Sequence, residues 1–189
     1  MKKYELTAEF IEKWGKKLFR IKALISFGSV EAGELGGYVE KEDNLAQTGN
    51  ARVSGDAWVS GNAWVSGDAW VYGNAWVSGN AWVSGNARVY GDARVCGDAW
   101  VSGDADYLLI GRIGSRFSFT TFFKNKDKGI TVSCGCFLGT IAEFRAKVTD
   151  THGNNKHAKM YNLAADMAEL QILGEEHFDK LNTNKSELF

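Results

Sequence analysis

Residues 49–108 read GNARVS, GDAWVS, GNAWVS, GDAWVY, GNAWVS, GNAWVS, GNARVY, GDARVC, GDAWVS and GDADYL, ten six-residue repeats without an insertion. In most repeats a small residue, a large residue, Val and a polar residue follow one another, and this alternation is typical of a strand with one buried face. Gly followed by Asn or Asp supplies a corner, because Gly adopts positive φ readily and Asn and Asp tolerate the left-handed region. We therefore expect one short strand and one corner from each repeat.

Three such repeats would make one triangular coil of 18 residues, and successive coils would pair as parallel sheets about 4.8 Å apart. Ten repeats give slightly more than three coils, or about four if the less regular blocks 37–42 and 43–48 join them. The chain contains no proline, a residue that would remove a hydrogen-bond donor from such a ladder. The sequence thus predicts a mainly β protein with a parallel β-helix over residues 37–108.

The repeats place a small residue four positions after an aliphatic one, as in Val59 and Ala63. This spacing resembles the hexapeptide-repeat family over about 60 residues. The resemblance implies that the β-helix is left-handed and that the protein is a homo-oligomer, either a trimer or a dimer.

The large residues of the repeats would point outward and stack at intervals of 18 residues. The expected columns are Trp64, Trp82 and Trp100; Trp58, Trp76 and Arg94; and Arg52, Trp70, Arg88 and Asp106, with Tyr72 and Tyr90 beside the third. Stacked rings and cation–π pairs could simply stiffen the rod. Three Trp in one column could also expose several hundred Å² of apolar surface, which is typical of an interface. We expect the rod to associate with itself or with a partner protein, foremost through Trp64, Trp82 and Trp100.

Two enzyme activities of the hexapeptide-repeat family depend on histidine. Its acyltransferases use a histidine base on the helix wall, and its carbonic anhydrases bind zinc through three histidines. Here the histidines are His152, His157 and His177, all beyond the repeats. We therefore expect a protein that is not an enzyme and uses no cofactor, with an acyltransferase as the enzymatic alternative.

The flanks of the repeats have a different pattern. Residues 1–36 are expected to cap the open end of the β-helix, with a strand in KKLFRIKALISFG (16–28) and with Trp14 and Phe19 in its core. Residues 109–189 are expected to form a small α+β domain. Its predicted elements are a hairpin of 117–124 and 130–137, a helix opening with a capping box at 140–143 and carrying Ile141, Phe144 and Val148 on one face, and a helix over 156–173 with a buried stripe of Met160, Leu163, Met167 and Leu170.

Two short segments of the C-terminal region carry polar chemistry. Residues 111–116, GRIGSR, could bind an anion through Arg112, Ser115 and Arg116, or could simply be a flexible connection. Cys134 and Cys136 would lie on one face of a strand. With His152 and His157 they could suggest a metal site, but the spacing fits no strong zinc pattern, so we interpret them as buried structural cysteines and predict no metal.

The composition limits the surroundings in which the protein acts. The net charge of −1 gives no bulk attraction for nucleic acid, so direct nucleic-acid binding is not expected. No apolar run of about 18 residues predicts a membrane span, and the N-terminal residues do not read as a secretory signal. An odd number of cysteines, Cys96, Cys134 and Cys136, fits a reducing cytoplasm.

The segments LFRIKALISFGSVEAGELGGYVEKEDNLAQTGNARVSGDAWV (18–59), IGSRFSFTTFF (113–123) and GITVSCGCFLGT (129–140) resemble a group of uncharacterised phage and prophage proteins with GDA-[RW]-V-[SY] coils. The resemblance covers nearly the whole chain. It implies a phage accessory protein in the cytoplasm of a bacterial host, binding a host protein such as a nuclease or CRISPR-type defence complex. The alternative is a small-ligand protein that stacks sugars or bases on its aromatic columns or holds a nucleotide at residues 112–116.

Overall fold

The computed structural model describes residues 1–179, and these divide into two compact units. The first unit is Met1–Asp104, and the second begins at Ala105. Each unit has its own sheets and its own core. No helix within residues 1–179 combines the length and the hydropathy of a membrane span.

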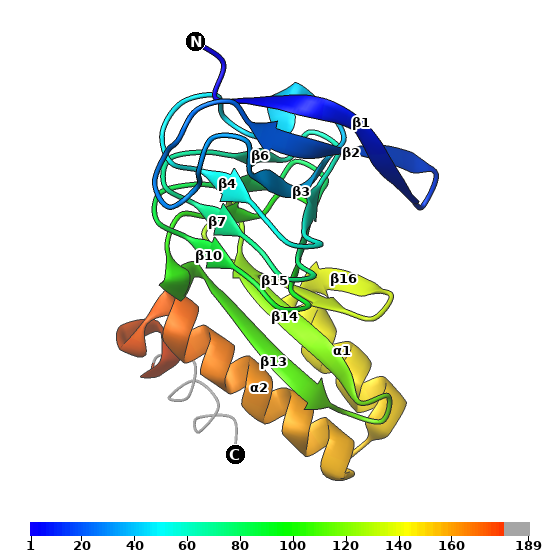
Figure 1. The fold of residues 1–189 in the computed structure, drawn as a ribbon. Helices are drawn as coiled ribbons and strands as arrows, with labels where there is room; N and C mark the ends of the chain where they lie inside the picture. The colour runs from blue at the N-terminus through cyan, green and yellow to red at the C-terminus, as the bar shows by residue number, and fades with distance from the viewer. Residues whose placement is uncertain (180–189) are drawn as a thin grey trace. The chain divides into compact units, whose positions relative to one another are not determined.

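The first unit is built around a parallel β-solenoid, in which each repeat contributes a strand of two residues. Its strands are β4 (Arg52–Val53), β5 (Trp58–Val59), β6 (Trp64–Val65), β7 (Trp70–Val71), β8 (Trp76–Val77), β9 (Trp82–Val83), β10 (Arg88–Val89), β11 (Arg94–Val95) and β12 (Trp100–Val101). Figure 1 shows β4, β7 and β10 stacked on one side of the coil. The predicted β-helix is therefore confirmed.

The pairing of the strands confirms the 18-residue coil. Trp64 pairs with Trp82, and Trp82 pairs with Trp100, both in parallel register. The other two sides follow the same rule, with strand orders β5-β8-β11 and β4-β7-β10. Inside the coil, the Ala and Val of the nine repeats from 49 to 102 are at most 2% exposed. The interior is thus filled by two small side chains per repeat.

The corners are held by glycine and by ladders of side-chain amides. Gly79 has φ +71°, and a Cβ there would lie 2.8 Å from the backbone nitrogen of Gly97, so a larger residue would clash with the next coil. Beside the glycines, Asn50 donates to Asp68 at 2.9 Å, and Asn74 donates to Asp92 at 3.3 Å. In the sequence, no two corner Asp residues lie 18 positions apart. The corner columns therefore avoid direct stacking of like charges.

The irregular residues before the repeats also join the solenoid. β3 (Leu35–Val39) pairs in parallel with β5, and Leu45 bridges Val65. Both pairs are offset by 20 residues, so the first coil holds two residues more than the others. A 3-10 turn, η1 (Glu42–Asn44), lies in this coil. With it, the solenoid has about four turns, as the sequence predicts when 37–48 join.

The tenth repeat does not form a solenoid strand, which corrects the expectation that the coils extend to residue 108. Asp104–Asp106 form a 3-10 turn, η2, and Asp106 does not pair with Arg88 in the third column. The cause is visible in GDADYL, where Tyr107 stands at the inward position that Val occupies in the other nine repeats. A Tyr side chain is too large for an interior packed around Ala and Val.

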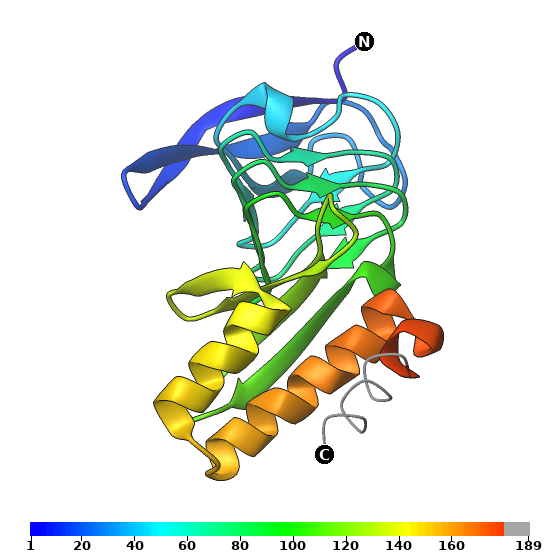
Figure 2. The ribbon, with the colours of Figure 1, turned by 180° about the vertical axis from the view of Figure 1, so that it is seen from behind.

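The N-terminal residues form a hairpin, β1 (Tyr4–Lys13) and β2 (Lys16–Ala23), whose second strand pairs with β3. Figure 2 shows the hairpin reaching beyond the coils. Trp14 and Phe19 are not its core, which corrects the prediction: Trp14 is 66% exposed at the hairpin tip, and Phe19 is half-buried. Leu18 and Ile21 are buried in their place because a register shift between Arg20 and Lys22 interrupts the simple alternation.

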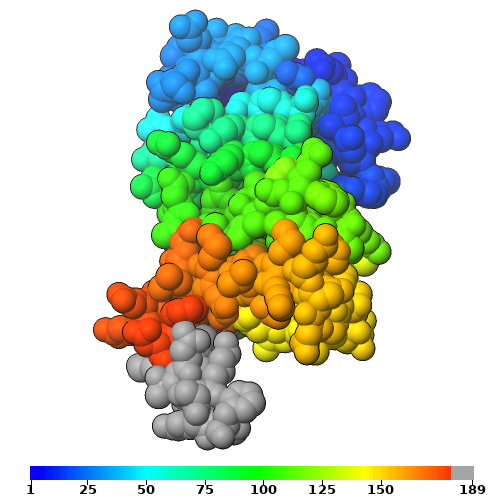
Figure 3. All heavy atoms as spheres, turned by 90° about the horizontal axis from the view of Figure 1, so that it is seen from below, coloured from blue at the N-terminus to red at the C-terminus, as the bar shows by residue number. Residues whose placement is uncertain are grey.

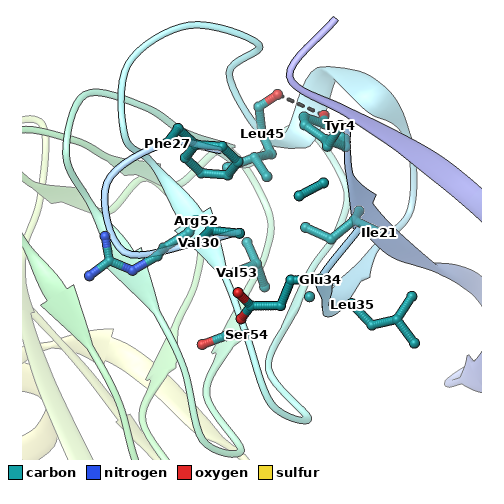
Figure 4. A pocket seen from close by; sticks show the side chains of 12 residues that line it. Tyr4, Ile21, Phe27, Val30, Glu34, Leu35, Leu45, Arg52, Val53 and Ser54 are labelled. Carbon is teal, nitrogen blue, oxygen red and sulfur yellow. Dashed lines mark hydrogen bonds between the residues drawn. The ribbon is translucent and has the colours of Figure 1, made fainter. Parts of the chain in front are cut away.

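Lys3 closes the open end of the coils. Its side chain is buried, and its Nζ donates to the Ala51 carbonyl at 2.8 Å and lies 3.4 Å from the Gly49 carbonyl. Burial lowers the pKa of Lys3 to about 8. Close by, the Tyr4 hydroxyl donates to the Leu45 carbonyl, at 2.8 Å, beside a cavity of about 20 Å³ (Figure 4). That cavity is too small for an organic ligand. We therefore assign the region around Lys3 and Tyr4 to the cap and not to a binding site.

The second unit contains an antiparallel sheet in the order β13-β14-β15-β16. Its strands are β13 (Tyr107–Ile113), β14 (Ser118–Lys124), β15 (Ile130–Cys134) and β16 (Phe137–Thr140). The predicted hairpin is confirmed as β14 and β15, but β15 ends at Cys134, because Gly135, with φ +62°, begins a tight turn to β16. Residues 111–116 end β13 and turn into β14, so they are not a connection between domains.

Two helices, α1 (Ile141–His152) and α2 (Lys156–Leu173), pack on this sheet. Thr140 and Glu143 form the predicted capping box of α1, and Phe144 and Val148 are buried as predicted. The predicted stripe of α2 is wrong. Its buried face is mainly alanine, and the four Met and Leu residues of the stripe are exposed: Met160, Leu163, Met167 and Leu170.

Candidate binding surfaces

The column of Trp64, Trp82 and Trp100 is the most open aromatic face of the solenoid. The three side chains are 41%, 40% and 44% exposed. Ring centroids lie 5.3 Å apart in both successive pairs, and Trp82 and Trp100 are nearly parallel at 11°. Because each ring is fixed by its neighbours and by a strand, the column presents a stiff apolar strip to its surroundings.

The second column is covered from within the chain. Trp14, at the tip of the β1–β2 hairpin, stacks on Trp76 with centroids 4.2 Å apart and lies 5.2 Å from Trp58. Trp58 is consequently only 6% exposed. Arg94 continues the column, with its guanidinium 5.9 Å from the Trp76 ring. This face is therefore already partly occupied by the cap.

Trp14 and its neighbours line a groove of about 360 Å³. Asn62 and Asn80, from the same corner of two successive coils, also line the groove, together with Ser60, Ser78 and Lys16. The groove thus combines aromatic faces with amide and hydroxyl groups. The sequence interpretation assigned Trp14 to the core of the cap and so missed it as a surface residue. Trp14 and Gly15 both have positive φ at the hairpin tip, but Trp-Gly is not one of the usual two-residue turn signals.

The third column is an alternating ladder. The Arg52 guanidinium lies 4.2 Å from the Trp70 ring, and burial lowers the pKa of Arg52 from its ordinary value. Trp70 also stacks on Tyr72 at 4.2 Å, and Tyr72 stacks on Tyr90 at 5.4 Å. Arg88 pairs with Trp70 in the sheet and is exposed. Two arginines and two tyrosine hydroxyls make this face more polar than the Trp64 column.

A pocket of about 440 Å³ lies in the second unit, between the two hairpin turns and α1. Its apolar wall contains Phe137, Phe144, Val148 and Tyr161. Its polar groups come from three separate segments: Ser115, Arg116 and Ser118; Cys134 and Cys136; and Lys147, Thr151 and His152. Among the described residues that line it, none is acidic.

The floor of the pocket is tightly built. A Cβ at Gly114 would overlap the Tyr161 hydroxyl, so this turn requires glycine for the ring to lie against it. Burial and the neighbouring Cys134 raise the pKa of Tyr161 to about 12, which keeps the hydroxyl protonated. The Thr120 hydroxyl lies 3.2 Å from the Cys134 sulfur. These groups hold one another in place and form the wall of the pocket.

Of the three residues predicted to bind an anion, the structure brings Ser115 and Arg116 into this pocket. Arg112 is exposed on β13, with its guanidinium 5.9 Å from the Phe119 ring. Lys147 and Tyr161 were missed, because only the tertiary fold places α1 and α2 beside the hairpin turns.

The cysteines differ from the expectation of buried structural residues on one strand face. Cys134 ends β15 and is half-buried, whereas Cys136 lies in the turn and is exposed. His152 and His157 have ring centroids 5.8 Å apart. Within residues 1–179, no group of three or more His, Cys, Asp or Glu side chains is arranged to hold a metal ion.

The outer side of α2 is a further apolar surface, and its atoms lie at the surface in Figure 3, in orange. Met160, Leu163, Met167 and Leu170 are 39%, 64%, 56% and 45% exposed, and they follow one another at intervals of three, four and three residues. This is the spacing of a helix seam that packs against another helix.

Comparison with known protein families bears on the coils alone. Their sequence matches the YdcK beta solenoid repeat. The matches fall on residues 49–61, 57–73, 69–85, 81–97 and 87–103. Together with the strand pairing described above, they show a β-solenoid repeat protein. No curated protein matches the chain.

Proposed function

We propose that the protein is a non-catalytic interaction protein whose solenoid associates with itself through the column of Trp64, Trp82 and Trp100. The observation that carries the proposal is the exposure of three stacked Trp side chains on one flat side of a rigid rod. Taking about 250 Å² for a whole Trp side chain, the exposed fractions leave about 300 Å² of Trp surface. A contiguous apolar patch of this size on a monomer is often functional.

The area also sets the expected strength of association. Pairing two such columns removes about 600 Å² from water, or about 15 kcal/mol at ~25 cal/mol/Å². Association itself costs about 4–15 kcal/mol. The difference is at most about 11 kcal/mol, so we expect a dimer or trimer with a dissociation constant of about 10 nM or weaker.

The experiment is a measurement of molar mass in solution by sedimentation equilibrium across a range of concentrations. The test variant replaces Trp64, Trp82 and Trp100 by Ser. The matched control replaces Arg88, Tyr90 and Arg94 by Ser, since these are also exposed side chains that point outward from the coils. The proposal requires that the wild type and the control associate and that the Trp variant remains monomeric. A wild type that stays monomeric at every concentration would contradict it.

A second surface fits a partner protein. The outer face of α2 offers Leu163 and Met167 at its centre, and a partner helix could pack its own apolar stripe against them. We propose that this face binds a host protein. The resemblance to phage proteins supports a phage accessory protein that acts in a bacterial cytoplasm. On this proposal, the target is a component of a nuclease or CRISPR-type defence complex. Binding of such a purified component by the wild type, lost in Leu163→Glu, is the test.

A specific observation favours a second candidate function, sugar binding, at the groove beside Trp14. The Trp14 ring is 66% exposed and stands near the amides of Asn62 and Asn80. A flat aromatic face beside amide groups suits the apolar face and the hydroxyls of a sugar ring. Quenching or enhancement of Trp fluorescence by an oligosaccharide, absent in Trp14→Ala, would support this function.

A further inference from the structure

The pocket of the second unit has the form of a small-molecule site and is independent of the surfaces proposed for protein binding. Its volume of about 440 Å³ lies within the range of about 300–1,000 Å³ that is usual for ligand sites. Like such sites, it joins a mostly apolar wall to a few polar groups at its edge. We propose that this pocket binds a nucleoside monophosphate.

The charge of the pocket selects an anion. Arg116 and Lys147 are permanent cations at neutral pH, and both line the pocket. The whole chain carries a net charge of −1, so this local excess of positive charge is a property of the pocket. Lys147 does pair with Asp150 at 3.0 Å, but both side chains are mostly exposed, at 63% and 72%. An exposed pair of this kind is weak, so Lys147 is available to a bound anion.

The number of donors favours phosphate over carboxylate. Besides the two cations, the hydroxyls of Ser115, Ser118 and Thr151 line the pocket. A carboxylate has two oxygens to accept from these groups, whereas a phosphate monoester has three terminal oxygens and up to two negative charges. Two cations and three hydroxyls match the dianion in charge and in number of donors. The Arg116 guanidinium, close to Gly135 in the turn, can offer paired N–H groups to two phosphate oxygens.

The apolar part of the pocket favours a ligand in which a flat, apolar ring is attached to the phosphate. The volume is several times that of a phosphate group, and the inner wall is formed by Phe137, Phe144, Val148 and Tyr161. Phe137 is half-buried and can contact a ring placed over the edge of the hairpin turn. A nucleobase supplies such a ring, and a nucleoside monophosphate joins it to a dianionic phosphate.

The first experiment measures binding to the full chain by isothermal titration calorimetry. AMP, GMP, CMP and UMP are compared with adenosine and with inorganic phosphate. We expect at least one nucleotide to bind at least tenfold more tightly than either fragment, since charge and ring contacts add. The proposal is overturned if no nucleotide binds at concentrations up to about 10 mM, or if inorganic phosphate binds as tightly as the nucleotides.

Variants then locate the site. Arg116→Gln is expected to raise the dissociation constant at least tenfold, while Arg112→Gln, an exposed arginine on β13 that does not line the pocket, leaves it unchanged. Asp150→Asn, which frees Lys147, is expected to tighten binding. Equal losses in Arg116→Gln and Arg112→Gln would show nonspecific attraction and overturn the assignment. Circular dichroism confirms that each variant is folded.

A chemical readout tests the same site without a mutation. Cys136 is exposed at the edge of the pocket, and Cys96 lies in the solenoid unit. Bound nucleotide should slow alkylation of Cys136 by iodoacetamide, measured by mass spectrometry, and leave the rate at Cys96 unchanged. An unchanged rate at Cys136 under saturating nucleotide would place the ligand elsewhere and contradict the proposal.

Discussion

Replacing Asn74 by Asp would place three carboxylates in one column of solenoid corners. Asp56 and Asp92 lie 18 residues before and after Asn74, and the Asn74 amide donates to the Asp92 carboxylate at 3.3 Å. The substitution removes that hydrogen bond and sets like charges about 5 Å apart on both sides. Because all three side chains are exposed, the dielectric constant of water applies to their repulsion.

The magnitude follows from these distances. Two charges about 4 Å apart in water interact by about 1 kcal/mol, so two neighbours about 5 Å away contribute about 1.5 kcal/mol. The lost hydrogen bond adds about 1 kcal/mol. We expect the free energy of unfolding of the solenoid to fall by about 2.5 kcal/mol at low ionic strength. In 1 M salt the Debye length is about 3 Å, so most of the repulsive part should vanish.

Urea unfolding, at low and at high salt, measures this change. The matched control is Asn62→Asp, because Asn62 stacks on the neutral Asn80 and its side-chain oxygen lies 3.4 Å from Lys41 Nζ. The control should therefore lose much less stability. Equal losses in the two variants, or a loss in Asn74→Asp that salt does not reduce, would refute the description of the corners as charge-alternating ladders.

Three further predictions concern the cap and the second unit. Burial lowers the pKa of Lys3 to about 8, below its value of about 10.4 in an unfolded chain. Between about pH 8 and about pH 10.4 the unfolded state therefore binds more protons than the folded state, and the free energy of unfolding should rise with pH by up to about 1.4 kcal/mol per unit. Lys3→Met should lack this rise when unfolding by urea is measured across the same pH range. Arg145 contacts the buried Glu169 at 2.7 Å, so Arg145→Met should cost about 3–5 kcal/mol by leaving that carboxylate unpaired, and a loss below 1 kcal/mol would contradict the contact. Ala168→Leu should cost about 1–3 kcal/mol by overpacking, whereas Leu163→Gln should change thermal stability little. A larger loss in Leu163→Gln than in Ala168→Leu would instead support the orientation predicted from the sequence, in which the Met and Leu stripe of α2 is buried.

The solenoid could be predicted because its folding rule is local and repeated. Each repeat carries its own corner at Gly and its own inward pair of Ala and Val, so one repeat predicts the others. The single departure, at Tyr107, is also local: a large residue stands where Val is required. The columns of Trp follow directly from the 18-residue coil.

The orientation of α2 could not be predicted in the same way. Its stripe of Met and Leu has helical spacing, and so does its opposite face of small residues, with Ala164, Ala165 and Ala168. Alanine lets the helix approach the sheet and α1 closely, and Tyr161 supplies the bulk on that side. Hydrophobicity alone predicts that the face with the larger Met and Leu residues is buried. Close packing instead buries the face with the smaller alanines.

The pocket likewise has no local signal. Arg116, Cys136 and Lys147 belong to two turns and a helix, and only the tertiary arrangement brings them together. The sequence pointed to Ser115 and Arg116 through a Gly-rich, basic segment, but it could not separate them from Arg112. The spacing of residues along the sequence does not show which residues from other helices and turns will line the same site.

The proposed association is tested most directly by ¹⁹F NMR of the chain labelled with 5-fluorotryptophan, which reports separately on the seven Trp residues. Single substitutions assign the signals. As concentration rises, the signals of Trp64, Trp82 and Trp100 should shift or broaden together, while that of Trp58, covered within the chain, should not. Signals that stay constant at every concentration, or changes confined to Trp58 and Trp76, would contradict the assignment of this column as the face through which the protein associates.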